Sequence, residues 1–442
     1  MAPTPSALAQ RPRPHPAVVP PSSQAGWRAQ ALLWAPHRLG FFLAVALLLT
    51  ASAWWALVQL DRVGWGLGLV PALSPSLVHA AVMTFGFMPL FFAGFVFTAG
   101  PKWLGVAGPH ASHLLWPLLL QFGGWLLWLT GAHLDARLAL GGATLAVVGL
   151  TAMYGRFWRL VWASAAADRL HAKAVGWGGA VGLLSLLAMA VATAFGHIDL
   201  ALACVKTGLW GFVVVTFVAV LHRMLPFFTS SALPFIDAWR PFWVFWFLLG
   251  VVAMELAAVW APLLTTGDTM DGAKSPRAWM LFLGLCELAA GSVVAWLAVV
   301  WGLVQSLKIR LLAMLHLGFL WLSLALILSG ASQLLGLRLG VPVLGLGALH
   351  ALTMGFLGSL LLAMVTRVSC GHSGRTLVAD NWVWVLFWWL QVAVLLRIAS
   401  SLPSVPGWGL ALAAALWALL MGLWGLRLIR WYGQPRADGR PD

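Results

Sequence analysis

Long apolar stretches separated by short polar segments run along most of this chain. Each stretch has roughly 20 residues, the length that an α-helix needs to cross the hydrocarbon core of a bilayer. The pattern predicts twelve transmembrane helices, at residues 39–60, 76–98, 113–131, 137–155, 174–195, 200–222, 241–261, 278–301, 311–329, 343–365, 382–402 and 405–430. We therefore expect an all-α, polytopic membrane protein whose transmembrane domain covers residues 37–430.

The two ends of the chain differ from its middle. Residues 1–36 contain many Pro, Ala, Ser and Arg residues and no apolar core, so they predict a disordered tail rather than a signal peptide. Residues 431–442 are polar again and predict a short C-terminal tail.

Composition and charge agree with a membrane protein. The chain is 62% hydrophobic and only 9% charged, a balance outside the range of soluble globular domains. Its net charge of +14 could suggest nucleic acid as a partner, but the basic residues lie between the apolar stretches and form no interleaved patch. We expect no nucleic-acid binding. Most of the 26 Lys and Arg residues fall on one side if both termini are cytoplasmic, which favours that orientation in the lipid bilayer.

A weak internal repeat links three of the predicted helices. His79-Ala-Ala-Val-Met83 opens the second helix, and His350-Ala-Leu-Thr-Met354 opens the tenth. The sixth helix has Lys206 in the histidine position. Because these helices lie four apart and run in the same direction, the repeat predicts three four-helix units around a pseudo-threefold axis. The alternative is chance similarity among apolar residues.

Two histidines near the starts of apolar helices are the main candidates for cofactor chemistry. His79 and His350 occupy matching repeat positions, and ionisable residues within a bilayer usually have a function. Two neutral imidazoles from facing helices could ligate a b-type haem. The alternative is that each histidine donates a hydrogen bond to a neighbouring helix.

Other residues at the same depth could complete this site. Lys206 and Arg397 could contact haem propionates, although Lys206 could instead pair with Glu255. Met83 and Met354 follow the histidines by four residues and so share their helix faces. Their thioethers would suit Cu(I), but methionine in a helix most often serves packing.

A second set of polar residues is predicted near the cytoplasmic ends of the helices. His316 lies in the ninth predicted helix, and Cys370 and His372 follow the tenth. Imidazole and thiol groups together suit copper. The glycines of the segment Gly371-His-Ser-Gly-Arg375 would allow a tight turn that aims His372 into the bundle. His222 is expected to be an interfacial residue.

Four segments resemble the signature segments of the NnrS family: residues 79–103, 223–229, 314–326 and 350–377. The motif Arg38-Leu-Gly-Phe-Phe is similar to the family's opening motif. NnrS proteins are multi-pass proteins of the bacterial inner membrane, described as containing haem and copper and associated with nitric oxide metabolism and nitrosative stress. The resemblance implies both cofactors, nitric oxide as a ligand or substrate, and a redox donor. It also implies ligand roles for the matching residues His79, His350, His316 and His372.

Three functions stay open at this point. One is a haem- and copper-binding protein of nitric oxide metabolism or nitrosative stress resistance. The second is a nitric oxide reductase-like redox enzyme with a haem-copper oxidase-like architecture. Against it, the sixth helix has no His-Pro-Glu-Val-Tyr-type copper motif, and the tenth has a single histidine where that architecture has His-x-His. The third is a secondary transporter, although no pair of helices shows the Gly/Pro interruptions at mid-depth that broken helices need. Whether the protein is an enzyme is undecided by its sequence.

Overall fold

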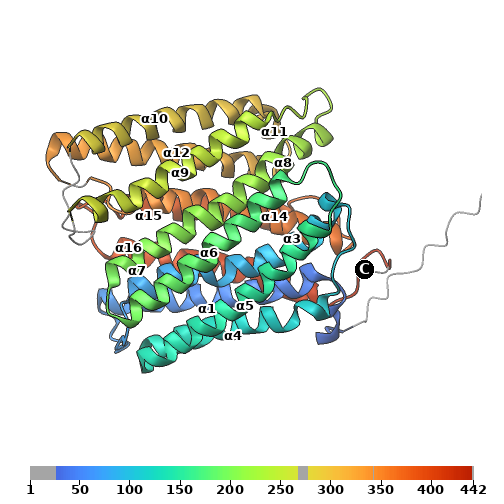
Figure 1. The fold of residues 1–442 in the computed structure, drawn as a ribbon, viewed down its shortest axis with the longest axis horizontal. Helices are drawn as coiled ribbons and strands as arrows, with labels where there is room; N and C mark the ends of the chain where they lie inside the picture. Colours follow the sequence, from blue (N-terminus) through green and yellow to red (C-terminus); the bar gives the residue numbers. More distant parts are fainter. Residues whose placement is uncertain (1–25, 267–276, 342, 441–442) are drawn as a thin grey trace, which may run out of the picture.

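The computed structural model describes residues 26–266, 277–341 and 343–440. Within these residues it contains helices and no strands, and twelve helices are long and apolar enough to cross a membrane. Figure 1 shows these helices running side by side along the long axis of the molecule. Helices are the expected solution, because in lipid only intrahelical hydrogen bonds or a closed barrel can satisfy the backbone. The predicted all-α polytopic class is confirmed.

The spans fall into three groups of four in chain order. The first group consists of α1 (Pro36–Leu60), the second span made of α2 (Pro75–Ala81), η3 (Val82–Gly86) and α3 (Phe87–Leu104), then α4 (Ala111–Leu134) and α5 (Ala136–Ala163). The second group consists of α6 (Leu170–Ala194), the sixth span made of α7 (Ile198–Gly208), η4 (Leu209–Val214) and α8 (Val215–Ala232), then α9 (Phe242–Thr266) and α10 (Arg277–Val300). The third group follows the short α11 (Leu303–Ser306) and consists of α12 (Arg310–Leu339), the tenth span made of α13 (Gly347–His350), η5 (Ala351–Gly358) and α14 (Ser359–His372), then α15 (Asn381–Ala399) and α16 (Trp408–Tyr432).

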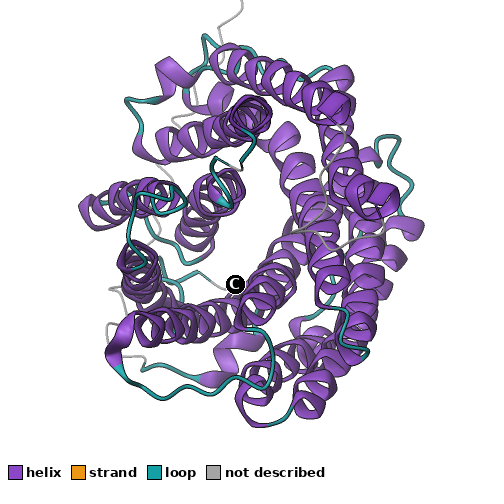
Figure 2. Ribbon diagram, turned by 90° about the vertical axis from the view of Figure 1, so that its left-hand side faces the viewer, coloured by secondary structure: helices purple, strands orange, loops and turns teal. Residues whose placement is uncertain are grey.

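These three groups close into a ring. The last helix of each group packs against the first helix of the next: α5 against α6, α10 against α12, and α16 back against α1. Figure 2 shows the helices nearly end-on in this closed arrangement. Three four-helix units around a common axis would produce these contacts.

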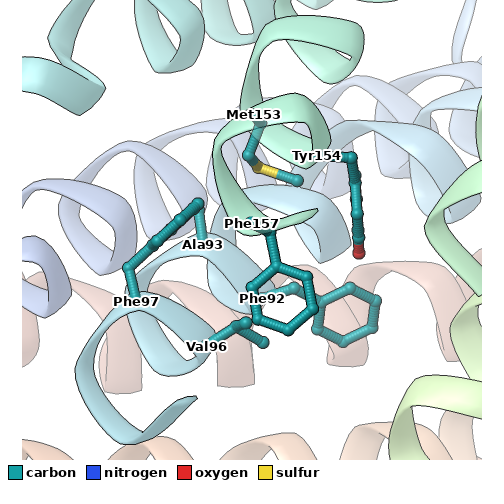
Figure 3. Close-up of a pocket in the computed structure, with 7 residues that line it drawn as sticks. All are labelled: Phe92, Ala93, Val96, Phe97, Met153, Tyr154 and Phe157. Atoms are coloured by element: carbon teal, nitrogen blue, oxygen red, sulfur yellow. The ribbon is translucent and has the colours of Figure 1, made fainter. Parts of the chain in front are cut away.

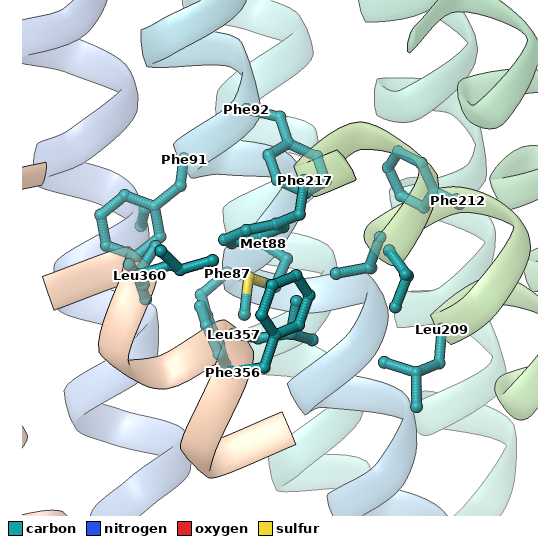
Figure 4. Close-up of a cluster of buried hydrophobic side chains, with 14 of the residues drawn as sticks. Phe87, Met88, Phe91, Phe92, Leu209, Phe212, Phe217, Phe356, Leu357 and Leu360 are labelled. Atoms are coloured by element: carbon teal, nitrogen blue, oxygen red, sulfur yellow. The ribbon is translucent and has the colours of Figure 1, made fainter. Parts of the chain in front are cut away.

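The second, sixth and tenth spans meet in an aromatic cluster inside the bundle (Figure 4). Phe92 of α3 lies edge-on to Phe212 of η4 and Phe217 of α8, with ring centroids 5.5 and 5.8 Å apart. Phe217 in turn lies 6.0 Å from Phe356 of η5. Edge-to-face ring pairs contribute about 0.5–1.5 kcal/mol each beyond the burial of their area. Contacts between phenylalanine rings thus connect the three spans.

Each of these three spans also contains a π-helical segment near its start. The segments η3, η4 and η5 begin within one helical turn after His79, Lys206 and His350, respectively. The π-helix is rare in proteins and is often found at functional sites. The same local distortion therefore follows the same repeat position in all three spans.

The predicted tails differ from the structure at both ends of the described chain. A 3₁₀ helix, η1 (Ala29–Leu33), lies within the predicted N-terminal tail and buries two of its residues. Its neighbour Arg28 donates its backbone N–H to the Gly433 carbonyl at 2.8 Å, so both chain ends lie at one end of the bundle. We call this the terminal end. Residues 1–25 of the predicted tail are outside the described residues.

Helices α4 and α5 pack with their backbones in close contact. A Cβ atom added at Gly142 would collide with the Gly124 carbonyl oxygen, and one added at Gly124 would lie 2.5 Å from the Gly142 oxygen. Small residues at such crossings allow helices to approach closely in a membrane, where lipid provides no hydrophobic drive for their association.

We expect Gly142→Ala to lower the thermal unfolding temperature of the detergent-purified protein, because its methyl group would push α5 away from α4. Gly141→Ala is the matched control, since a Cβ at Gly141 meets nothing within 4 Å. Alanine favours a helix over glycine by about 1 kcal/mol, so the control should be neutral or slightly stabilising. Equal behaviour of the two variants would contradict the close crossing.

Candidate functional site

His79 and His350 lie near each other at the end of the bundle opposite the terminal end. His79 lies near the start of the second span and His350 near the start of the tenth, and the two side chains interact electrostatically. The His79 ring stacks on Trp55 of α1, with centroids 4.0 Å apart and planes at 12°. Its buried Nδ1 atom has no hydrogen-bond partner. The structure thus brings the two repeat histidines to the same end of the bundle, and their role as haem ligands stays a prediction.

The orientation of His350 suits a metal ligand. Its Nδ1 atom lies 2.9 Å from the Leu346 carbonyl oxygen, one turn back along the helix. Because a carbonyl only accepts, Nδ1 carries the proton and Nε2 keeps its lone pair. Metal-bound histidines almost always donate their second ring nitrogen in this way, which fixes both the tautomer and the ring orientation.

Two arginines surround the histidine pair. Arg397 of α15 interacts electrostatically with both histidines and donates to the Ser401 hydroxyl at 2.8 Å. Arg62, at the end of the first span, also interacts with His79, and its guanidinium lies 5.5 Å from the Trp55 ring centroid. Sequence reasoning selected Arg397 but treated Arg62 as a loop residue. The seven-residue spacing from Trp55 to Arg62 was the available signal, since it places both on one helical face.

Lys206 belongs to a cavity beside this pair. The cavity has a volume of about 210 Å³ and is also lined by Glu255, Glu287 and Leu349. Lys206 therefore lies near the turn that carries His350, and it shares its surroundings with two carboxyl groups. Both sequence-based alternatives for Lys206, propionate contact and carboxylate pairing, remain compatible with this position.

The residues at this end fit a haem in their donor chemistry. His350 presents an Nε2 lone pair, His79 has an unpartnered buried ring nitrogen, and Arg397 supplies positive charge beside both. Met83 and Met354 lie in the π-helical segments that follow the two histidines, packed with the apolar core. Their role as metal ligands stays a prediction.

At the terminal end, the His372 ring lies beside the ring of His37, a residue that the sequence did not indicate as a candidate. The rings of His372 and His37 lie 4.3 Å apart at 36°. His37 is only 4% exposed, and its Nδ1 atom has no hydrogen-bond partner. The predicted first helix started after His37, whereas α1 begins at Pro36. Proline favours the first position of a helix, which would have placed His37 inside the span.

The tenth span ends later than predicted, which changes the local geometry of Cys370 and His372. Both residues lie in the last turn of α14 rather than in a loop, and Cys370 is buried. Residues two apart on a helix point in different directions, so these side chains do not share a face. The turn follows at Gly374, which has φ +70° and closely approaches Asp438. The predicted turn is therefore real but lies after His372.

Residues 433–440 fold back over the end of α14 and hold this region in place. Arg38 donates to the carbonyl oxygens of Tyr432 and Gln434 at 2.8 and 2.7 Å. Arg436 donates to the His372 carbonyl at 3.1 Å. Arg375 lies 4.4 Å from the centroid of the Trp431 ring, and burial lowers the pKa of its guanidinium. The segment predicted as a polar tail is thus part of the candidate site.

His316 is placed elsewhere in the bundle. Its Nε2 atom lies 2.9 Å from the Thr229 hydroxyl, whose proton is donated to the Leu225 carbonyl. His316 must therefore donate through Nε2, which leaves a lone pair on the buried, unpartnered Nδ1. Across the described residues, no three His, Cys, Asp or Glu side chains gather in a metal-binding arrangement. The structure does not bring His316, Cys370 and His372 together, and their copper role stays a prediction.

His222 differs from its expected interfacial position. It is fully buried, and its Nδ1 atom lies 2.9 Å from His171 Nε2, while its Nε2 atom lies 3.1 Å from the Pro241 carbonyl. Phe245 of α9 packs against both rings of this histidine pair. The position of His222 beside Arg223 in the sequence did not indicate this burial.

A small cavity between α3 and α5 is shown in Figure 3. It has a volume of about 10 Å³ and is lined by apolar and aromatic residues, among them Phe92, Met153 and Tyr154. That is about the room of a single water molecule, so we assign it no ligand.

Comparison with known protein families matches residues 31–436 to the family described as NnrS protein. No curated protein matches the chain.

Asp380 provides a test of the contacts at the terminal end. Its Oδ1 atom accepts from the Val383 N–H at the start of α15, and its Oδ2 atom accepts from Arg427. The hydrogen bond from Arg427 lowers the pKa of the Asp380 carboxyl. Stability from a lowered carboxyl pKa is present above the unfolded value of about 3.9 and is lost as the pH falls through the folded value.

We expect Asp380→Asn to keep the helix cap and to lower the free energy of unfolding at neutral pH by under about 1 kcal/mol, because the ion pair is half exposed. Asp380→Ala should cost about 1 kcal/mol more, since it also removes the cap. Thermal unfolding in detergent measures both. The wild type and Asp380→Asn should converge at acidic pH, and a difference that persists there unchanged would contradict the ion-pair account.

Proposed function

Since this chain belongs to the NnrS family, we propose that it is a haem-binding membrane protein of nitric oxide metabolism or nitrosative stress resistance. Its twelve spans make it a multi-pass membrane protein. The observation that carries the proposal is the pairing of His79 with His350 beside Arg397. The family membership supports a location in the bacterial inner membrane, and the distribution of Lys and Arg supports an orientation with both termini in the cytoplasm.

Each residue of this pair would have a defined task in holding a haem b. His79 and His350 would hold its iron, and the Leu346 carbonyl keeps the His350 ring in one tautomer. Arg397 would offset the charge of the propionates. The Trp55 ring covers one face of His79 and keeps water from it. When bound, the haem would supply an iron able to exchange electrons or, if one histidine is released, to bind nitric oxide.

This coordination favours a binding or electron-carrying role over catalysis. If both histidines hold the iron, a substrate would have to compete with them for it. We therefore rank the redox enzyme second and a secondary transporter third.

Copper is the second cofactor in the proposal. His372 and the buried His37 form an imidazole pair at the terminal end, and imidazole suits copper in both common oxidation states. His316, with its unpartnered Nδ1 atom, is a separate candidate. Cys370 remains in the set only if the end of α14 unwinds, because on the helix it faces away from His372.

We expect the detergent-purified protein to show the absorption spectrum of a bis-histidine haem b. His79→Ala and His350→Ala should each lower haem occupancy by more than about tenfold, because second-sphere changes alone cost tenfold or more in metal affinity. His197→Ala is the matched control, an exposed histidine at the same end of the bundle. Metal analysis and gel filtration should accompany the spectra. An unchanged haem band in both ligand variants would refute the site.

We expect the reduced protein to take up at most about one nitric oxide per haem, without turnover, because two histidine ligands would compete with nitric oxide for the iron. A nitric oxide electrode measures this directly, with buffer and the His350→Ala variant as controls. Sustained consumption that His350→Ala abolishes would instead establish the enzyme. Transport of a substrate into proteoliposomes by haem-free protein would establish the transporter.

A further inference from the structure

The cavity that contains Lys206 lies among the sixth to tenth spans and holds an unusual pair of acidic residues. Glu255 comes from α9 and Glu287 from α10, and both line the cavity. They are 7% and 1% exposed. Ser329 and Gln333 of α12 provide further polar groups in the lining, and the volume of about 210 Å³ is enough for several water molecules.

The two carboxyl groups lie close enough to interact directly with each other. Glu287 Oε1 also accepts from the Ser329 hydroxyl at 2.9 Å. Glu255 Oε1 and Glu287 Oε2 have no donor among the described residues. Ionised carboxylates can only accept hydrogen bonds, and two negative charges side by side within a membrane would repel each other strongly. The contact between Glu255 and Glu287 therefore requires a proton on one of them.

We propose that Glu255 and Glu287 form a proton-holding site in the membrane interior, which shares one proton and exchanges it with water in the cavity. A pair that holds one proton has a charge of −1. Lys206 lines the same cavity and places a basic side chain beside the pair.

The position of the cavity connects this site to the tenth span. Leu346 and Leu349 line the cavity wall, and the Leu346 carbonyl holds the ring of His350. The helical turn from Leu346 to His350 therefore contacts both the cavity and the histidine site. The proposal does not depend on haem binding, because it rests on the buried carboxyl pair and the cavity alone.

Infrared spectroscopy tests the proposal, since a protonated carboxyl has a C=O stretching band separate from that of ionised carboxylates. At neutral pH we expect the purified protein to show a band equivalent to about one carboxyl per chain. The band should shift when H₂O is replaced by D₂O. It should disappear in both Glu255→Gln and Glu287→Gln, because the glutamine amide can donate to the remaining carboxylate.

Asp168→Asn is the control, since the Asp168 side chain is 44% exposed and should contribute no protonated band. Absence of the band in the wild type, or its persistence in both glutamine variants, would overturn the shared proton. A band that does not shift in D₂O would overturn exchange with the cavity and leave a static structural pair.

If the glutamine variants fail to fold, Glu255→Asp keeps the carboxyl, and its band should be retained at a displaced frequency. An unmoved band in that variant would also refute the assignment.

Discussion

Aromatic packing among the second, sixth and tenth spans is the contact on which the rest of the structure depends. Phe92, Phe217 and Phe356 link these spans directly. Since the three spans run in the same direction, holding them together also gathers the residues at their starts. His79, Lys206 and His350 reach one end of the bundle for this reason. The outer helices then close the ring around them.

The repeat position carries two different chemistries. In the first and third groups it is a histidine, and these two side chains lie together beside Arg397. In the second group it is Lys206, which faces a cavity with two buried carboxyl groups. A threefold arrangement of similar helices thus provides two distinct polar sites within one apolar bundle. The two sites differ because the second group has Lys206 at the position where the other two groups have a histidine.

The spans were predictable because the bilayer imposes a length and a composition that the sequence displays directly. The pairing of His79 with His350 was also predictable, since a repeat places matching residues at matching depth. The partner of His372 was not. His37 is more than 300 positions away in the chain, and depth alone says nothing about which helices are neighbours around a ring. The same limit explains why His316 was grouped with His372 and Cys370, although it bonds Thr229 instead.

The contacts of Arg38 have a consequence for the biogenesis of the protein. This buried arginine lies at the start of the first helix to enter the membrane, yet its carbonyl partners belong to Tyr432 and Gln434 at the end of the last. While the chain is being synthesised, those partners do not yet exist. Arg38 can therefore form these two hydrogen bonds only after α16 is in place. The first helix can thus reach its final packing only after the last helix has been made, because α16 packs against α1 to close the ring.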